Sequence, residues 1–331
     1  MARKNPIRKS CDNARKNLEK MGYALVGETS AVQICRWTKN SIRGDRGCWK
    51  EKFYGISSAG CCQMTPSVLW CENKCLHCWR PIELSEGSKL PSVEDPKEIL
   101  DGIVAARKKL LMGFKGKKDI DLKKFEESLE PKLYTMSLSG EPTLYPRLDE
   151  MFEEIRKRNA VSFLVTNGLN SEVIKNLKTF PTQITVSTNA PNEKLFNIWH
   201  RSTKKDAWQE FLKTLDVIKT LESKVRRVIR LTIVKPSESN EISNMSEDNI
   251  EEYVTLIKRA QPDFVHIKGF MSVGYARNRM GYDKQPWFEE VKEYANKILE
   301  KLDGFELGAE DERSCVIMLA KKGKKLKIEK I

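Results

Sequence analysis

Three cysteines are close together in the segment "CENKCLHC", where Cys71, Cys75 and Cys78 follow the pattern C-x3-C-x2-C. Structural zinc sites use four ligands, and these usually form two separated pairs. His77 could supply a fourth ligand, but a tight loop can hardly turn His77 and both neighbouring cysteines onto one ion. A [4Fe–4S] cluster can accept three thiolates and leave one iron without a protein ligand. The spacing therefore favours an iron–sulfur cluster with an open iron, and zinc remains the alternative.

A second set of cysteines precedes the first and has the pattern C-x12-C-x12-C, formed by Cys35, Cys48 and Cys61. Each lies in basic or aromatic surroundings. We interpret the set as ligands of a second cluster, again with one open iron. The alternative is a scatter of buried free thiols, because free cysteine behaves as a small hydrophobic residue. The remaining cysteines have no comparable partners and are expected to be structural or incidental: Cys11, Cys62 and Cys315.

Composition limits the class of protein. The 331 residues carry a formal net charge of +13, which suits a polyanion such as nucleic acid as a binding partner. The alternative is a lysine-rich solvated surface.

The N-terminus is charged without an apolar core after it, and no apolar run approaches the ~20 residues that cross a bilayer. We therefore expect a cytoplasmic protein without a membrane partner, and clustered cysteines in that reducing compartment indicate metal ligands or catalytic thiols.

Alternating strands and helices must position these cysteines. The pattern predicts an α/β protein with a parallel sheet, either an open doubly wound sheet or a partial barrel. The last two apolar runs, 305–308 and 315–320, are predicted to pair as an antiparallel hairpin. Strands are predicted at 67–70, 132–139, 161–166, 183–188, 226–234 and 263–269. Helices are predicted at 96–114, 145–159, 172–179, 204–221, 246–261 and 286–302.

Polar residues follow each predicted strand. In parallel α/β proteins, catalytic and binding residues lie at the carboxyl ends of the strands. Any one of these segments could be an ordinary turn. Together with the cysteines they predict a shared pocket, formed by Cys71 and segments 139–143, 166–168, 187–191, 235–239 and 268–274.

The first cysteine loop, with Trp79 after its last cysteine, resembles that of the radical S-adenosylmethionine enzymes. The resemblance implies a cluster whose open iron chelates the cofactor, which is cleaved to a deoxyadenosyl radical. "SGEP" resembles the family's glycine-glutamate loop, with Ser139 in place of the usual first glycine. The implied cofactor-binding residues are Ser139, Gly140, Glu141, Thr166, Asn167, Ser187 and Asn189, with 268–269 near the adenine.

The two cysteine sets together resemble the tRNA 4-demethylwyosine synthases. Further similar stretches are "CWKEKFYGI", "SLSGEPTLYP", "FLVTNG", "WHRSTKKDAWQEFL" and "VGYARNR". This resemblance implies a partial (β/α)6 barrel of the TIM type. We expect a cysteine-bearing extension at 1–62, the barrel at 63–303, and a hairpin with a basic tail at 304–331.

The resemblance also implies a reaction. Its substrates are N1-methylguanosine at position 37 of phenylalanine tRNA and pyruvate, which the second cluster would hold as a Lewis acid. Lys50 could form a Schiff base with the pyruvate ketone or pair with its carboxylate; the alternative is a surface lysine near a metal loop. These residues include no flavodoxin-like segment, so we expect a separate flavodoxin- or ferredoxin-like electron donor. We expect a monomer.

Basic and aromatic residues in the loops could dock the anticodon stem and stack on the extruded base. The aromatic candidates are Trp37, Trp79, Trp199 and Tyr275, and the tail 321–330 could bind phosphate. The basic candidates are Arg43, Arg46, Arg80, Arg201, Lys204, Lys205, Arg277 and Arg279. Two alternatives remain: another radical enzyme whose second cluster relays electrons, and a non-catalytic iron–sulfur or zinc protein that binds nucleic acid.

Overall fold

The computed structural model describes residues 6–238 and 241–329, with side chains from residue 13 onward. The side chain of Cys11 and residue 239 of the predicted segment 235–239 therefore lie outside the described part. Among the residues described, no helix is both long and apolar enough to span a lipid bilayer.

One mixed sheet of ten strands organises the described chain, in the order β1-β2-β3-β4-β5-β6-β7-β8-β10-β9. Strands β3 to β8 are parallel, and antiparallel strands extend the sheet at both edges. The two edge strands, β1 and β9, do not pair with each other, so the barrel is open, as predicted. The parallel strands are β3 (Cys61–Thr65), β4 (Leu133–Met136), β5 (Val161–Thr166), β6 (Gln183–Ser187), β7 (Arg226–Ile233) and β8 (Phe264–Gly269). The antiparallel strands are β1 (Tyr23–Val26), β2 (Ser30–Gln33), β9 (Phe305–Asp311) and β10 (Val316–Lys321).

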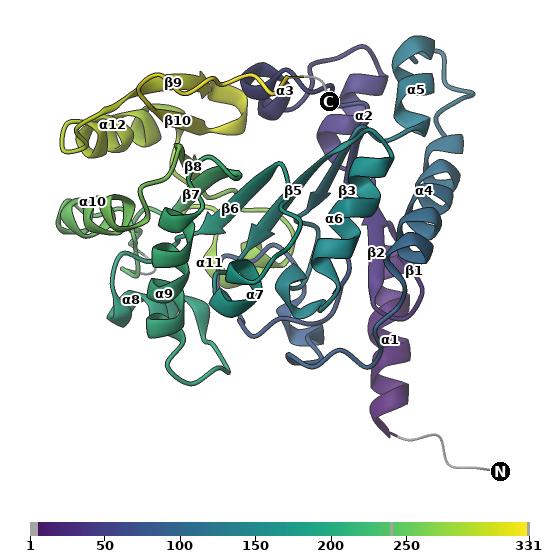
Figure 1. Ribbon diagram of the computed structural model, residues 1–331, viewed down its shortest axis with the longest axis horizontal. Helices are drawn as coiled ribbons and strands as arrows, with labels where there is room; N and C mark the ends of the chain where they lie inside the picture. Colours follow the sequence, from purple (N-terminus) through teal and green to yellow (C-terminus); the bar gives the residue numbers. More distant parts are fainter. Residues whose placement is uncertain (1–5, 239–240, 330–331) are drawn as a thin grey trace.

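Helices lie along the outer face of this sheet (Figure 1). Helix α4 begins at Pro96, where the Asp95 side chain accepts hydrogen bonds from the backbone N–H groups of Lys97 and Glu98. The longer helices are α1 (Pro6–Lys20), α4 (Pro96–Met112), α6 (Leu148–Lys157), α9 (Ala207–Thr220), α10 (Asp248–Ala260) and α12 (Phe288–Leu299). The shorter ones are α2 (Arg36–Ile42), α3 (Trp49–Tyr54), α5 (Leu122–Leu129), α7 (Ser171–Lys175), α8 (Glu193–His200) and α11 (Tyr275–Met280).

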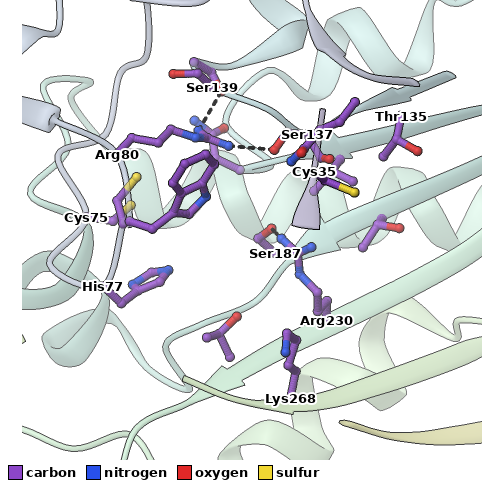
Figure 2. A pocket seen from close by; sticks show the side chains of 18 of the residues that line it. Cys35, Cys75, His77, Arg80, Thr135, Ser137, Ser139, Ser187, Arg230 and Lys268 are labelled. Atoms are coloured by element: carbon purple, nitrogen blue, oxygen red, sulfur yellow. Dashed lines mark hydrogen bonds between the residues drawn. The ribbon is translucent and has the colours of Figure 1, made fainter. Parts of the chain in front are cut away.

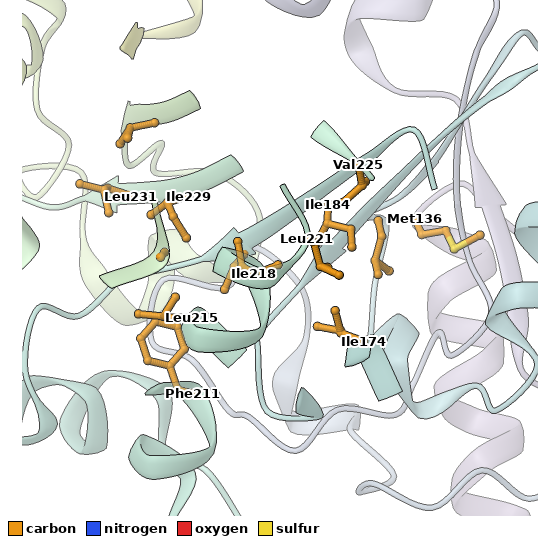
Figure 3. Packing of buried hydrophobic residues seen from close by; sticks show 14 of the residues in the cluster. Met136, Ile174, Ile184, Phe211, Leu215, Ile218, Leu221, Val225, Ile229 and Leu231 are labelled. Atoms are coloured by element: carbon orange, nitrogen blue, oxygen red, sulfur yellow. The ribbon is translucent and has the colours of Figure 1, made fainter. Parts of the chain in front are cut away.

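The main core lies between the sheet and these helices. Figure 3 shows Ile184 of β6 and Ile229 of β7 near Leu215 and Ile218 of α9. A second apolar cluster lies around α3, where Phe53 and Tyr54 pack with Leu133, Val161 and Phe264, the first residues of β4, β5 and β8. Helix α3 therefore closes the barrel interior at the amino ends of these strands.

The predicted strand at 67–70 is wrong. The first parallel strand is β3, which ends just before Pro66, and Trp70 N–H donates to Ser67 O in a turn. Proline has no N–H to donate to a strand ladder, so the pairing stops there. The apolar residues of 67–70 are nevertheless buried, as Val68, Leu69 and Trp70 pack in a small core with Leu138.

The predicted C-terminal hairpin is confirmed, and β10 also joins the sheet beside β8. The predicted boundary at 62/63 falls inside β3, so the extension and the barrel share one sheet. The division into three segments stays a prediction.

Candidate active site

A cavity of about 470 Å³ lies inside the barrel, within the range of small-molecule sites (Figure 2). Its lining includes every cysteine predicted to bind a cluster, together with Lys50. It also includes all of the predicted cofactor residues: Ser139, Gly140, Glu141, Thr166, Asn167, Ser187 and Asn189. The predicted site residues, which span more than 150 positions of the sequence, thus meet in one place.

The first cysteine loop is held by contacts from two helices, α8 and α11. Cys75 Sγ lies 3.1 Å from His200 Nδ1, and Leu76 N–H donates to Trp199 O. The Arg279 guanidinium donates to the carbonyl oxygens of Leu76, Cys78 and Arg80. Figure 2 shows Cys75 on a different side of the cavity from Cys35 of the second set.

Burial raises the pKa values of two thiols of the first set, Cys71 and Cys75, so both favour their protonated forms when nothing is bound. Burial raises the pKa of Cys75, and the neighbouring Cys71 and Cys78 raise it further. No three metal-binding side chains of the described residues are arranged around a single ion. In a [4Fe–4S] cluster each thiolate binds a different iron, so the thiols stand further apart than the ligands of one ion. A positively charged iron core would stabilise these buried thiolates, so the residues fit such a cluster.

Ser58 links the three cysteines of the second set. Cys48 N–H donates to Ser58 Oγ at 2.6 Å, and Cys61 N–H donates to Ser58 O at 3.3 Å. Thr38 completes the link, because its hydroxyl donates to Ser58 O and its N–H donates to Cys35 Sγ. Burial raises the pKa of Cys48 to about 12, with contributions in the same direction from Cys35 and Cys61. As in the first set, neighbouring thiols raise the pKa of a buried cysteine. A positively charged iron core would stabilise the thiolates, so these residues fit a second cluster.

Lys50 lies in the first turn of α3, whose N-cap residue is Cys48. Its ammonium donates to Thr135 Oγ1 at 3.3 Å and stands 5.7 Å from the centre of the Phe163 ring. Its positive charge lowers the pKa values of Cys48 and Cys61 against the larger effect of burial. Helix α3 thus presents an amine to the cavity beside the second cysteine set.

Glu141 lies in a network that suits a cationic ligand. Its carboxylate accepts hydrogen bonds from Thr143 N–H and Oγ1, from Thr166 Oγ1 at 2.7 Å, and from Asn167 N–H at 2.7 Å. Burial raises the pKa of Glu141, and the nearby carboxylate of Glu72 raises it further. A bound ammonium group would relieve this repulsion.

The residues before Glu141 are structural. Gly140 has φ +69°, and a Cβ there would lie 1.6 Å from Ser67 O, so only glycine fits. The Ser139 hydroxyl donates to Val68 O at 2.7 Å. Both residues fix the "SGEP" loop against the cysteine segment.

The two predicted cofactor residues at the carboxyl end of β6 take different partners. Ser187 Oγ accepts from Arg230 Nη2 at 2.8 Å. Asn189 contacts His77 Nε2 at 3.3 Å and accepts from Thr232 N–H. Asn189 therefore also positions the first cysteine loop.

The predicted tRNA-binding residues are dispersed. Arg201, Lys205 and Arg277 are exposed, while Arg46 pairs with Asp311 and Lys204 with Glu210. Arg43 lies in a second hollow beside the cavity, together with Trp37 and Trp79. RNA contact stays a prediction for these residues.

Three side chains that were predicted to contact RNA are instead buried or hydrogen-bonded within the protein. Trp199 is 0 % exposed and stacks on His77, so the idea that it stacks on a base is wrong. Arg279 is only 14 % exposed because its guanidinium holds the cysteine loop. Arg80 donates to Ser137 O at 2.8 Å while it lines the cavity.

Sequence reasoning missed several residues of the site. Arg230 interrupts the apolar part of β7 that follows Arg226 and Arg227, and such a charge within a buried strand is a usable signal. Glu72 directly follows Cys71 and accepts from the side chains of Asn167 and Asn170. Ser58 and Thr135 carry no sequence signal, because their roles depend on contacts between distant segments.

Family models match most of the chain. A model described as "Radical SAM superfamily" matches residues 65–248, and one described as "Wyosine base formation" matches residues 259–321.

Relatives of known name match at greater length. The chain is 40 % identical over 305 residues to the S-adenosyl-L-methionine-dependent tRNA 4-demethylwyosine synthase of Pyrococcus abyssi, covering 91 % of this chain and 86 % of that one. It is 35 % identical to the Methanocaldococcus jannaschii enzyme of the same name, covering 94 % and 96 %.

Two solved structures share the fold. "Structure of TYW1 with a lysine-pyruvate adduct bound" superposes with a TM-score of 0.81 at 33 % identity, covering 96 % of this chain and 97 % of that chain. "Crystal structure of archaeal TYW1" gives a TM-score of 0.75 at 32 % identity, covering 96 % and 99 %. The chain belongs to the radical S-adenosylmethionine superfamily and, within it, to the family of tRNA 4-demethylwyosine synthases.

Proposed function

We propose that this enzyme condenses N1-methylguanosine at position 37 of phenylalanine tRNA with pyruvate to form 4-demethylwyosine. The observation that carries the proposal is the meeting of both cysteine sets and Lys50 in one cavity. The names of the relatives support the tRNA reaction, and the lysine–pyruvate adduct in a related structure supports the second substrate.

Each side chain has a role in this proposal. Cys71, Cys75 and Cys78 would hold the cluster that, with bound S-adenosylmethionine, supplies the deoxyadenosyl radical. The Glu141 carboxylate would accept the ammonium of the methionine group, and Thr166 and Asn167 orient that carboxylate.

Cys35, Cys48 and Cys61 would hold a second [4Fe–4S] cluster. Lys50, fixed by Thr135, would form a Schiff base with the ketone of pyruvate and so hold its carbonyl carbon in place. The methyl carbon of the base, after losing a hydrogen atom, attacks that carbon. The carboxylate leaves with the unpaired electron as a carbon dioxide radical anion, which one electron from the external donor and a proton convert to formate. The exocyclic amine of the base then displaces Lys50 from the imine, and a proton shift from the former methyl carbon to nitrogen completes the third ring.

The partners belong to the same proposal. A separate flavodoxin- or ferredoxin-like donor supplies the electrons, and the enzyme acts in the cytoplasm as a monomer. An electron-relay cluster and a binding-only protein are the alternatives, and neither accounts for an amine placed beside the second cysteine set.

The test incubates the reconstituted enzyme with reductant, S-adenosylmethionine, ¹³C-labelled pyruvate and phenylalanine tRNA carrying N1-methylguanosine. We expect pyruvate carbons in a tricyclic nucleoside, detected by mass spectrometry after digestion. Formation of deoxyadenosine without any labelled nucleoside would refute the proposed substrates while retaining the radical chemistry.

A further inference from the structure

Arg230 is a cation inside the cavity with a free hydrogen-bond donor. It projects from β7 between the buried residues Ile229 and Leu231 and lines the cavity. Its Nη2 donates to Ser187 Oγ at 2.8 Å, whereas Nε is buried and has no hydrogen-bond partner in the described part of the chain. A buried donor without an acceptor is costly, so the position calls for an acceptor that the protein does not supply.

A second cation stands beside it on the next strand. Lys268 of β8 is paired in register with Thr232 of β7 and lines the same cavity, and Figure 2 shows it next to Arg230. Its Nζ donates to Ser314 O at 2.6 Å. Burial lowers the pKa of Lys268 to about 8, and the charge of Arg230 contributes in the same direction. Two like charges, both half-buried in the cavity wall, favour an anion between them.

The described part of the protein offers no carboxylate for this role. No ion pair joins Arg230 or Lys268 to an acidic residue among the residues described. Glu141 is the acidic residue of the cavity lining, and its oxygens are bonded to Thr143, Thr166 and Asn167. The other lining cations, Lys50 and Arg80, add further positive charge.

We propose that Arg230 and Lys268 form a binding site for the carboxylate of a small molecule in the cavity, an inference that rests on the proposed function. The arginine fork and the lysine ammonium give charge-assisted hydrogen bonds to carboxylate oxygens. Two reactants carry such a group: the α-keto acid and the methionine part of S-adenosylmethionine. The site would fix the orientation of whichever reactant it binds.

The experiment measures equilibrium binding to the anaerobically reconstituted full chain by calorimetry. Its probes are two matched pairs, pyruvate with the neutral pyruvamide, and S-adenosylmethionine with its decarboxylated form. The variants are Arg230→Gln and Lys268→Met. Arg226→Gln is the control, because Arg226 lies on the same strand, bonds to Lys325 O and Leu326 O, and does not line the cavity.

Arg230→Gln should weaken binding of one acidic probe by at least about tenfold and leave its neutral counterpart within twofold. If the variant binds pyruvate more weakly, the site belongs to the keto acid. If it binds S-adenosylmethionine more weakly, the site belongs to the cofactor. Lys268→Met should affect the same probe, and Arg230→Lys should restore part of the affinity.

The inference is overturned if both acidic probes bind each variant within twofold of wild type. It is equally overturned if the acidic and neutral members of a pair weaken together, because the effect is then independent of the carboxylate. Failure of the proposed function has a different signature: the wild-type enzyme forms no labelled nucleoside even though one acidic probe still depends on Arg230.

Discussion

Burial determines how the charged side chains of this protein behave. Among the side chains that the structure describes, two arginines are completely buried, and they differ in their partners. Arg227 makes hydrogen bonds from Nε and Nη2 to both carboxylate oxygens of Asp263. Arg107 donates only to the neutral carbonyl oxygens of Ala59 and Ser128, next to the second cysteine set. The two positions allow a matched comparison.

Arg227→Met should lower the free energy of unfolding by about 3–5 kcal/mol, because it leaves the buried Asp263 carboxylate without its main partner. Arg107→Met should lower the free energy of unfolding by less, about 1–3 kcal/mol, because only neutral carbonyl oxygens lose their hydrogen-bond donor. Denaturant unfolding of both variants measures which one loses more free energy of unfolding. A larger loss for Arg107 would contradict this account of the two sites.

Glu141 should make stability depend on pH in the ligand-free protein. Burial raises its pKa in the folded state, with Glu72 adding to the shift. Its stabilising contribution is therefore complete below the unfolded-state pKa and is lost as pH rises through the folded-state value. Wild type should lose more stability than Glu141→Gln between pH 5 and pH 7.5 in unfolding experiments. If wild type and Glu141→Gln lose equal stability over this pH range, another group causes the pH dependence.

At the scale of elements, apolar runs predicted five of the six parallel strands. The polar residues after four of these strands predicted the cofactor side of the cavity, whereas 235–238, after β7, does not line it. The first strand was missed because its sequence, "CCQMT", is neither continuously apolar nor alternating, whereas the buried turn at 67–70 is apolar. The antiparallel strands β1 and β2 have only four residues each, too few to show a period. The link through Ser58 could not be predicted, because it joins residues 20 positions apart that meet only after folding.

The alternation of β3 separates two adjacent cysteines. Cys61 lines the cavity, and Cys62 packs in the core between the sheet and its helices. Reconstituted Cys61→Ala should hold about four irons, whereas wild type and Cys62→Ala should both hold about eight. Iron analysis with protein quantification measures both. Equal iron in the two variants would contradict the assignment of Cys61 as a ligand.

The C-terminal tail should stabilise helix α3. Ile328 N–H donates to Tyr54 O at 3.0 Å, and Leu326 and Ile328 pack on the cluster around Tyr54. Removing residues 324–331 should lower the free energy of unfolding by about 2–4 kcal/mol. It should also speed hydrogen exchange in α3, the helix that carries Lys50.

The control for this deletion keeps the chain and removes one charge, with Lys325→Ala. This side chain is exposed and pairs with Glu329 of the tail itself, so α3 should keep its protection. Faster exchange in the control would show that charge, and not apolar packing, holds the tail. Phosphate binding by the tail stays a prediction.

At the scale of the whole molecule, one continuous sheet joins three parts of the chain, and two of them line a single cavity. The N-terminal segment supplies the second cysteine set and Lys50, the parallel strands and the loops after them supply the predicted cofactor residues, and the C-terminal hairpin extends the sheet beside β8. We propose that the second cysteine set and Lys50 form the site of the keto acid, opposite the radical source.

Borohydride trapping tests whether pyruvate forms a Schiff base with Lys50. The reconstituted enzyme is mixed with ¹³C-pyruvate, reduced, digested and analysed by tandem mass spectrometry, with Lys50→Arg as the control variant. We predict one reduced pyruvate on the peptide that contains Lys50, and no trapping in the control. A label on Lys268, or on no lysine at all, would contradict the account.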